Sequence, residues 1–84
     1  MKDCEIKDKV YLIVAKSFDI DAAQLSHETK AEDIDGWDSL AHATLLLRLQ
    51  RTFNVDLDLR AANAAQTLGA LVTLVQNSIR ARNG

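Results

Sequence analysis

Apolar residues recur along this chain at spacings of three and four, which is the repeat of an α-helix with one buried face. The first such series predicts a helix over about residues 3–17. Its buried face comprises Ile6, Val10, Ile13, Val14 and, four residues further on, Phe18. No stretch alternates apolar and polar residues between turn residues, as a half-buried strand would.

A second apolar series predicts a helix over about residues 39–53. On a helical wheel the positions that face the core are Leu45, Leu46, Leu49 and Phe53. The opposite, polar side carries Thr44, Arg48, Arg51 and Thr52. Leu40 and Leu47 fall beside this polar side. They form either a small docking surface for a partner or a pair of isolated exposed leucines, which are common.

The remaining segments complete an all-α pattern. Asp58 caps a short alanine-rich turn over residues 59–65, and Thr67 caps a last helix. One face of that helix carries Leu68, Leu71, Val72, Val75 and Ile79. Residues 19–38 form a long connection with a partial turn over 21–24, and a loop of this length is often functional. The chain is therefore predicted to be a small bundle of three main helices plus one short helix, with a long loop between helices 1 and 2.

Length and composition indicate one small helical domain over residues 1–84, with residues 81–84 as a frayed tail. A chain of this size leaves little room for a deep, enclosed active site. No apolar run approaches the roughly 18 residues of a transmembrane helix, and the charged N-terminus lacks the apolar core of a secretory signal. Cys4 is the only cysteine, so no internal disulfide forms. We expect a cytoplasmic monomer.

The charges are distributed unevenly, although the net charge of −2 favours neither nucleic acid nor a membrane as partner. Residues 1–38 hold ten acids and five lysines, whereas residues 39–84 hold five arginines and two acids. The acids nearest to Ser39 are Glu28, Glu32, Asp33, Asp35 and Asp38. This acidic group either steers a basic partner toward Ser39 or is a solvated loop.

The junction at Ser39 is the most informative stretch. Asp38 is a good N-cap, because its carboxylate can accept hydrogen bonds from the first free N–H groups of the helix. Ser39 then occupies the first helical position with its hydroxyl left over, and Trp37 is placed to pack on His42. A phosphate ester on Ser39 would lie in the favourable field of a helix N-terminus.

The residues do not favour catalysis by Ser39 or metal binding. Asp38, Ser39 and His42 have the residue types of a nucleophilic triad, but neighbours on one helical turn supply neither an oriented imidazole nor oxyanion donors. His42 is better explained as a boundary residue packed against Trp37, and His27 as a solvent-exposed loop residue. Two distant histidines and one cysteine do not make a metal site, so none is predicted.

Residues Gly36-x-Asp38-Ser39-Leu40 resemble the attachment motif of acyl carrier proteins. The resemblance continues through Phe53-x-Val55-x-Leu57 to Thr67-Leu68-Gly69, which opens the final apolar helix, and it covers about residues 5–80. The tripeptide Asp-Ser-Leu alone is weak evidence. Its position at the start of the right helix, with the downstream pattern in register, makes the resemblance specific.

The resemblance implies a carrier and not an enzyme. A phosphopantetheinyl transferase would move 4′-phosphopantetheine from coenzyme A onto the Ser39 hydroxyl, and an acyl group would be held as a thioester on the thiol of that arm. Asp38 matches the aspartate that supports the modification. Leu40 matches a leucine that transferases and other partners contact. Docking on acyl-activating or acyl-transferring enzymes would use the second helix and the preceding loop, including Leu47, Asp35 and Trp37.

The chain also departs from the family pattern. Carriers of the main fatty-acid pathway typically bear several acids along the second helix, whereas here that helix carries Arg48 and Arg51 and no acid after Asp38. Together with Trp37, this indicates a specialised, free-standing carrier of a secondary-metabolite, modified-lipid or surface-polymer pathway. Two alternatives are an unmodified helical interaction module and a small hydrolase that uses Ser39.

Overall fold

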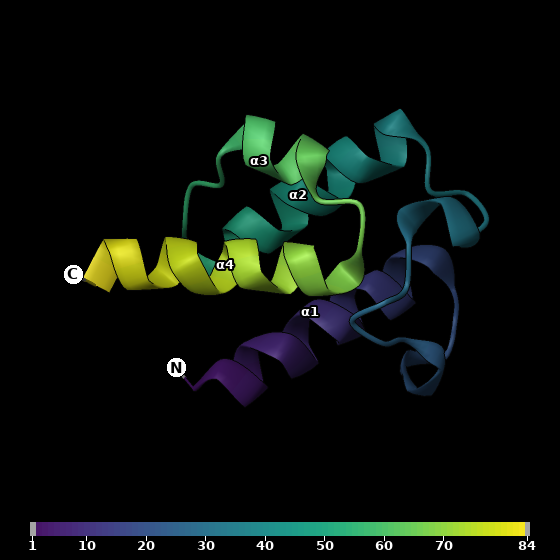
Figure 1. Ribbon diagram of the computed structural model, residues 1–84, viewed down its shortest axis with the longest axis horizontal. Helices are drawn as coiled ribbons and strands as arrows, with labels where there is room; N and C mark the ends of the chain where they lie inside the picture. Colours follow the sequence, from purple (N-terminus) through teal and green to yellow (C-terminus); the bar gives the residue numbers. More distant parts are fainter. Residues whose placement is uncertain (1, 84) are drawn as a thin grey trace.

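The computed structural model describes residues 2–83, with side chains described through residue 82, and these residues fold into a bundle of four α-helices (Figure 1). The three long helices are α1 (Asp3–Phe18), α2 (Ser39–Phe53) and α4 (Leu68–Asn83), and the short one is α3 (Leu59–Ala64). Two 3₁₀ turns, η1 (Ala22–Gln24) and η2 (Ala31–Asp33), lie in the long connection between α1 and α2. Residues 2–83 contain no strand, so the predicted all-α fold class is confirmed.

The core lies between α1, α2 and α4, with α3 closing one side. The four leucine and phenylalanine positions predicted to face inward from α2 are all buried: Leu45, Leu46, Leu49 and Phe53. The predicted apolar face of α4 is buried along its whole length, from Leu68 to Ile79. On α1, Ile6, Val10 and Val14 are buried, whereas Ile13 and Phe18 are half-buried and pack against the core. The helical wheel therefore gave the correct orientation of α2.

The C-terminal end of α2 is capped by a side chain from the last turn of α4. Asn54 ends α2 in the left-handed conformation (φ 54°), which asparagine tolerates better than most residues. The guanidinium of Arg82 donates hydrogen bonds to the Phe53 and Asn54 carbonyls, both at 2.7 Å. These bonds satisfy acceptors that a helix end otherwise leaves free. The helix α4 extends through Asn83, and residue 84 lies outside the described residues.

The long loop between α1 and α2 is attached to the start of α4. The Leu68 N–H donates to the Thr29 carbonyl at 2.8 Å, and the Gly69 N–H donates to the His27 carbonyl at 2.9 Å. The Tyr11 hydroxyl lies 2.8 Å from His27 Nδ1, and burial raises the pKa of Tyr11 from its ordinary value. His27 is exposed, as expected, but it also tethers the loop to two helices.

Gly69 has no room for a side chain. A Cβ at this position would lie 2.9 Å from His27 Cβ and 3.0 Å from the His27 carbonyl oxygen. By helix propensity alone, glycine at this position would destabilise the helix by roughly 1 kcal/mol relative to alanine. The close approach of the loop makes glycine the more stable choice here, because the methyl group of an alanine would displace the loop backbone.

Leu49→Ala should destabilise the protein by ~2–5 kcal/mol, because Leu49 is 0% exposed and its truncation leaves a cavity. Thr44→Ala, on the exposed face of the same helix, should change the free energy of unfolding by less than ~0.5 kcal/mol. Urea unfolding followed by circular dichroism measures both. Equal losses of unfolding free energy in the two variants would show that the side of α2 that faces the core is not the one described.

Gly69→Ala should destabilise the protein, although alanine is the better helix former by about 1 kcal/mol. The reason is the contact with His27 described above. Urea unfolding gives the sign directly, and Asn77→Ala on the exposed face of α4 is the control for helix propensity. A gain in stability for Gly69→Ala would mean that the loop does not approach α4 this closely.

The loop-to-helix junction at Ser39

The backbone turns sharply just before α2. Gly36 has φ +86°, in the left-handed region that glycine adopts without steric cost. The Trp37 N–H donates to the Ile34 carbonyl at 3.3 Å, and the Asp38 N–H donates to the Gly36 carbonyl at 3.1 Å. This turn places Asp38 in extended backbone immediately before the helix, where an N-cap residue lies.

Asp38 is the N-cap of α2, as the sequence predicted. Its Oδ1 accepts a hydrogen bond of 2.8 Å from the Ala41 N–H, the third N–H of the helix. Among the described residues, the N–H groups of Ser39 and Leu40 have no partner in the protein. Ser39 is exposed, and its hydroxyl forms no hydrogen bond with the described part of the chain. The helix therefore begins with a free alcohol beside two free N–H donors.

The Trp37 side chain is held by contacts with Phe18 and His42. Its indole stacks on Phe18 at the end of α1, with ring centroids 4.8 Å apart and planes 18° apart. Its Nε1–H donates to His42 Nδ1 at 3.0 Å, and His42 Nε2 lies 3.1 Å from the Ala62 carbonyl in α3. Because Nδ1 accepts, the proton of the neutral ring belongs on Nε2, which donates to Ala62. The predicted contact between Trp37 and His42 is confirmed, and it extends to α3.

This arrangement does not support catalysis by Ser39. Both ring nitrogens of His42 are engaged, one by Trp37 and the other by Ala62, so the imidazole is not placed as a base for the Ser39 hydroxyl. Within residues 2–83, no group of three or more His, Cys, Asp or Glu side chains is placed to hold a metal ion. The junction presents a hydroxyl without activating it.

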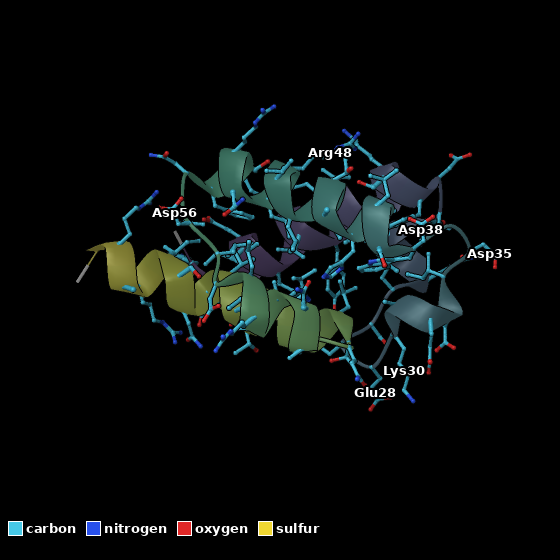
Figure 2. The ribbon with its side chains drawn as sticks, turned by 90° about the horizontal axis from the view of Figure 1, so that it is seen from above. Glu28, Lys30, Asp35, Asp38, Arg48 and Asp56 are labelled. Carbon is cyan, nitrogen blue, oxygen red and sulfur yellow. The ribbon has the colours of Figure 1, made fainter. Side chains whose placement is uncertain are left out.

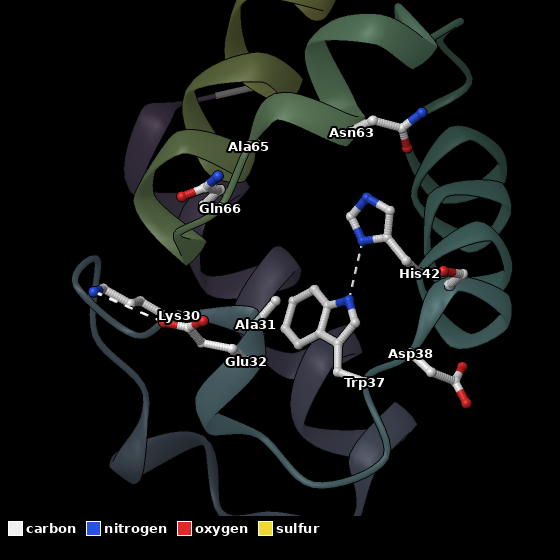
Figure 3. Close-up of a pocket in the computed structure, with 10 residues that line it drawn as sticks. Lys30, Ala31, Glu32, Trp37, Asp38, His42, Asn63, Ala65 and Gln66 are labelled. Atoms are coloured by element: carbon white, nitrogen blue, oxygen red, sulfur yellow. Dashed lines mark hydrogen bonds and ion pairs between the residues drawn. The ribbon is translucent and has the colours of Figure 1, made fainter.

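An open cleft of about 700 Å³ adjoins Ser39 (Figure 3). One wall comes from the loop before α2, a second from the first turn of α2, and a third from α3 and the segment that leads to α4. Its lining consists of Lys30, Ala31, Glu32, Trp37, Asp38, Ser39, His42, Asn63, Ala65 and Gln66. The sequence did not predict this cleft, because its walls come from segments that only the tertiary fold brings together.

The outer face of α2 combines apolar and charged side chains. Leu40 is 78% exposed and Leu47 is 55% exposed, in agreement with their predicted places beside the polar face. Arg48 and Arg51 are exposed further along the helix, and Arg48 donates to the Ser17 hydroxyl at 3.1 Å. Asp38 lies at the N-terminal end of α2 and Asp35 in the loop that precedes it, whereas Arg48 lies further along the helix (Figure 2). The face is therefore acidic near Ser39 and basic toward the C-terminal end of α2.

The fold and the junction together define a small helical domain that offers one exposed serine at the start of a helix. Residues 8–75 match the family model described as "Phosphopantetheine attachment site". The chain is 37% identical over 76 residues to the acyl carrier protein of Shigella flexneri, covering 89% of this chain and 96% of that one. It is also 37% identical over 57 residues to the acyl carrier protein of Chlorobium phaeovibrioides, covering 68% of this chain and 73% of that one.

Structural similarity agrees with the sequence matches. The solution structure of the holo acyl carrier protein from Geobacter metallireducens superposes with a TM-score of 0.80 at 31% sequence identity, over 92% of this chain and 88% of that one. The chain belongs to the acyl carrier protein family. Its role is to carry acyl groups on a phosphopantetheine prosthetic group and not to catalyse, so the predicted function class is confirmed.

Family membership also implies acyl-handling enzymes as partners and a phosphopantetheinyl transferase for activation. None of the helices within residues 2–83 combines the length and the apolar character needed to traverse a bilayer. The junction at Ser39 fits the prosthetic group on structural grounds, because it offers an exposed alcohol and two free N–H donors suited to a phosphate.

Proposed function

We propose that Ser39 Oγ is the attachment point of 4′-phosphopantetheine. The observation that carries this proposal is the exposed Ser39 hydroxyl at the first position of α2, with Asp38 capping a different N–H. When bound, the prosthetic group supplies a terminal thiol on which an acyl group is held as a thioester. The chain's own residues present and orient the arm.

The helix end suits a phosphodiester. The free N–H groups of Ser39 and Leu40 point out of the N-terminus of α2, where the helix dipole favours negative charge. The Asp38 carboxylate bonds to Ala41 and so leaves these two donors available. The cap therefore fixes the helix end without competing for the phosphate site.

We propose that partner enzymes dock on the outer face of α2 and the end of the loop. Leu40 and Leu47 are exposed apolar side chains about two turns apart, and Asp35 is an exposed negative charge in the loop that leads to the helix. Trp37 is half-buried near the end of the same loop, where its stacking on Phe18 holds the loop in place. The working form in this proposal is a cytoplasmic monomer in which residues 1–84 form one carrier domain.

We further propose that the chain serves a dedicated pathway and not the main fatty-acid pathway. Enzymes that recognise an acidic second helix would meet Arg48 and Arg51 here instead. Like charges brought together across an interface slow association and suppress the wrong partner. The two arginines therefore act as a specificity element against those enzymes.

Coexpression with a broad-specificity phosphopantetheinyl transferase should add one phosphopantetheine to the chain, because Ser39 is accessible at a helix end. Ser39→Ala should abolish the addition. Ser26→Ala, which removes another exposed serine in the loop, should leave it unchanged. Intact-protein mass spectrometry of the unaltered chain and the two variants measures the addition. Modification of the Ser39→Ala variant, or none of the original chain, would refute the attachment site.

The holo protein should be a poor substrate for the ketosynthase and malonyl transferase of fatty-acid synthesis. We expect kcat/KM to be about tenfold or more below that of the housekeeping carrier, because charge complementarity changes association rates by this order. The double variant Arg48→Glu with Arg51→Glu should have a higher kcat/KM with these enzymes. Lys9→Glu with Lys16→Glu makes the same charge change on exposed positions of α1 and should not. Turnover by the unaltered chain that equals the housekeeping carrier would defeat the idea of a dedicated carrier.

A further inference from the structure

We propose that the acyl-handling enzyme that works with this carrier places a carboxylate against Arg51, about 18 Å along α2 from Ser39. The inference rests on the proposed docking of partners on the outer face of α2, and it names the chemistry of the partner's surface. That surface would be apolar opposite Leu40 and Leu47 and acidic opposite Arg51.

Arg51 continues the row of exposed leucines on α2. Since each residue of an α-helix turns the chain by about 100°, Leu40, Leu47 and Arg51 lie within about 40° of one another around the helix. All three side chains are exposed, and Arg51 comes about one turn after Leu47. A partner that covers the two leucines therefore also covers Arg51.

Arg48, the other arginine of α2, is turned toward α1. It lies about 80° around the helix from Leu40, and its guanidinium donates a hydrogen bond of 3.1 Å to the Ser17 hydroxyl. Arg51, by contrast, forms no hydrogen bond or ion pair among the described side chains. A guanidinium covered by a partner loses its water contacts, and a carboxylate is the group that replaces them best. Arg51 therefore needs a carboxylate on the partner.

The space beside Arg51 has room for such a side chain. An open cleft of about 620 Å³ lies between the C-terminal half of α2, the segment that follows it and the end of α4, and its lining includes Leu47 and Arg51. The other charged residues that line it are Arg82 and Asp56. Asp56 forms no ion pair with either arginine among the described side chains. The cleft next to Leu47 therefore has a net positive charge.

The opposite charge at the start of α2 fixes the direction of docking. Asp38 caps the helix beside Ser39, and Asp35 is exposed in the loop before it. A partner that is basic near its active-site entrance and acidic about 18 Å away would pair with both ends of the helix. The same partner turned round would meet like charges at both ends, which is unfavourable. The charges thus select the orientation that brings Ser39 to the entrance.

The test uses the full chain with an octanoyl group on phosphopantetheine at Ser39, and the ketosynthase of fatty-acid synthesis as the probe. Each lysine and arginine around the active-site entrance of the ketosynthase is changed to glutamate in turn, and kcat/KM for octanoyl transfer from the carrier is measured. We expect a glutamate about 18 Å from the entrance to raise kcat/KM about tenfold or more, because attraction to Arg51 replaces repulsion. No increase with any of the glutamates would overturn the inference.

Variants of the carrier assign the gain to one arginine. Arg51→Glu should abolish the gain, whereas Lys16→Glu, the same charge change on an exposed position of α1, should preserve it. Arg48→Glu should preserve most of the gain, because that guanidinium is turned toward Ser17. A gain that persists in Arg51→Glu, or one that is lost only in Arg48→Glu, would overturn the inference.

Two leucine variants separate this inference from the proposed docking face. Leu40→Ala and Leu47→Ala should each lower kcat/KM by about fivefold or more, as expected for side chains at the centre of an interface. Intact mass and circular dichroism confirm that each variant is loaded and folded. Lower kcat/KM in both leucine variants without a gain that depends on Arg51 would overturn the inference alone. Unchanged kcat/KM in both would overturn docking on α2 and the inference together.

Discussion

The hydrogen bond from the Ala41 N–H to the Asp38 carboxylate determines how the rest of the site is arranged. It fixes the residue at which α2 begins and therefore the phase of every side chain along that helix. With this start, Leu45 and Leu49 face the core, and Leu40 faces solvent. A start one residue later would rotate the helix by about 100° relative to its cap and would make Ser39 a capping residue. The free alcohol at the helix end is thus a consequence of the cap.

The bundle supports this junction through the loop that precedes it. Hydrogen bonds from Leu68 and Gly69 to the carbonyls of Thr29 and His27 tie the loop to the start of α4. The stack of Trp37 on Phe18 ties the other end of the loop to α1. The loop is therefore held at both ends, and the helix start that follows it is fixed in space. A carrier needs such a fixed end, because the movement in its function belongs to the attached arm.

Much of the fold could be predicted from the sequence because its signals are local. Apolar residues at spacings of three and four predicted the long helices, and the N-cap at Asp38 predicted the first residue of α2. The contacts between distant segments could not be predicted in this way. His42 bonds to Ala62, which is 20 positions away in the sequence, and Gly69 contacts His27 only because the loop folds back on α4. The turn η2 also lies at such a contact, the hydrogen bond from the Ala31 N–H to the Gln66 carbonyl.

The central claim is that a group on Ser39 sits in the field of the first N–H groups of α2. The most direct measurement is a comparison of backbone amide proton signals before and after phosphopantetheine is attached. The account predicts downfield shifts for Ser39 and Leu40, whose N–H groups are free, and small changes for Ala41, whose N–H is bonded to Asp38. Unchanged Ser39 and Leu40 signals in a protein modified at Ser39 would contradict it.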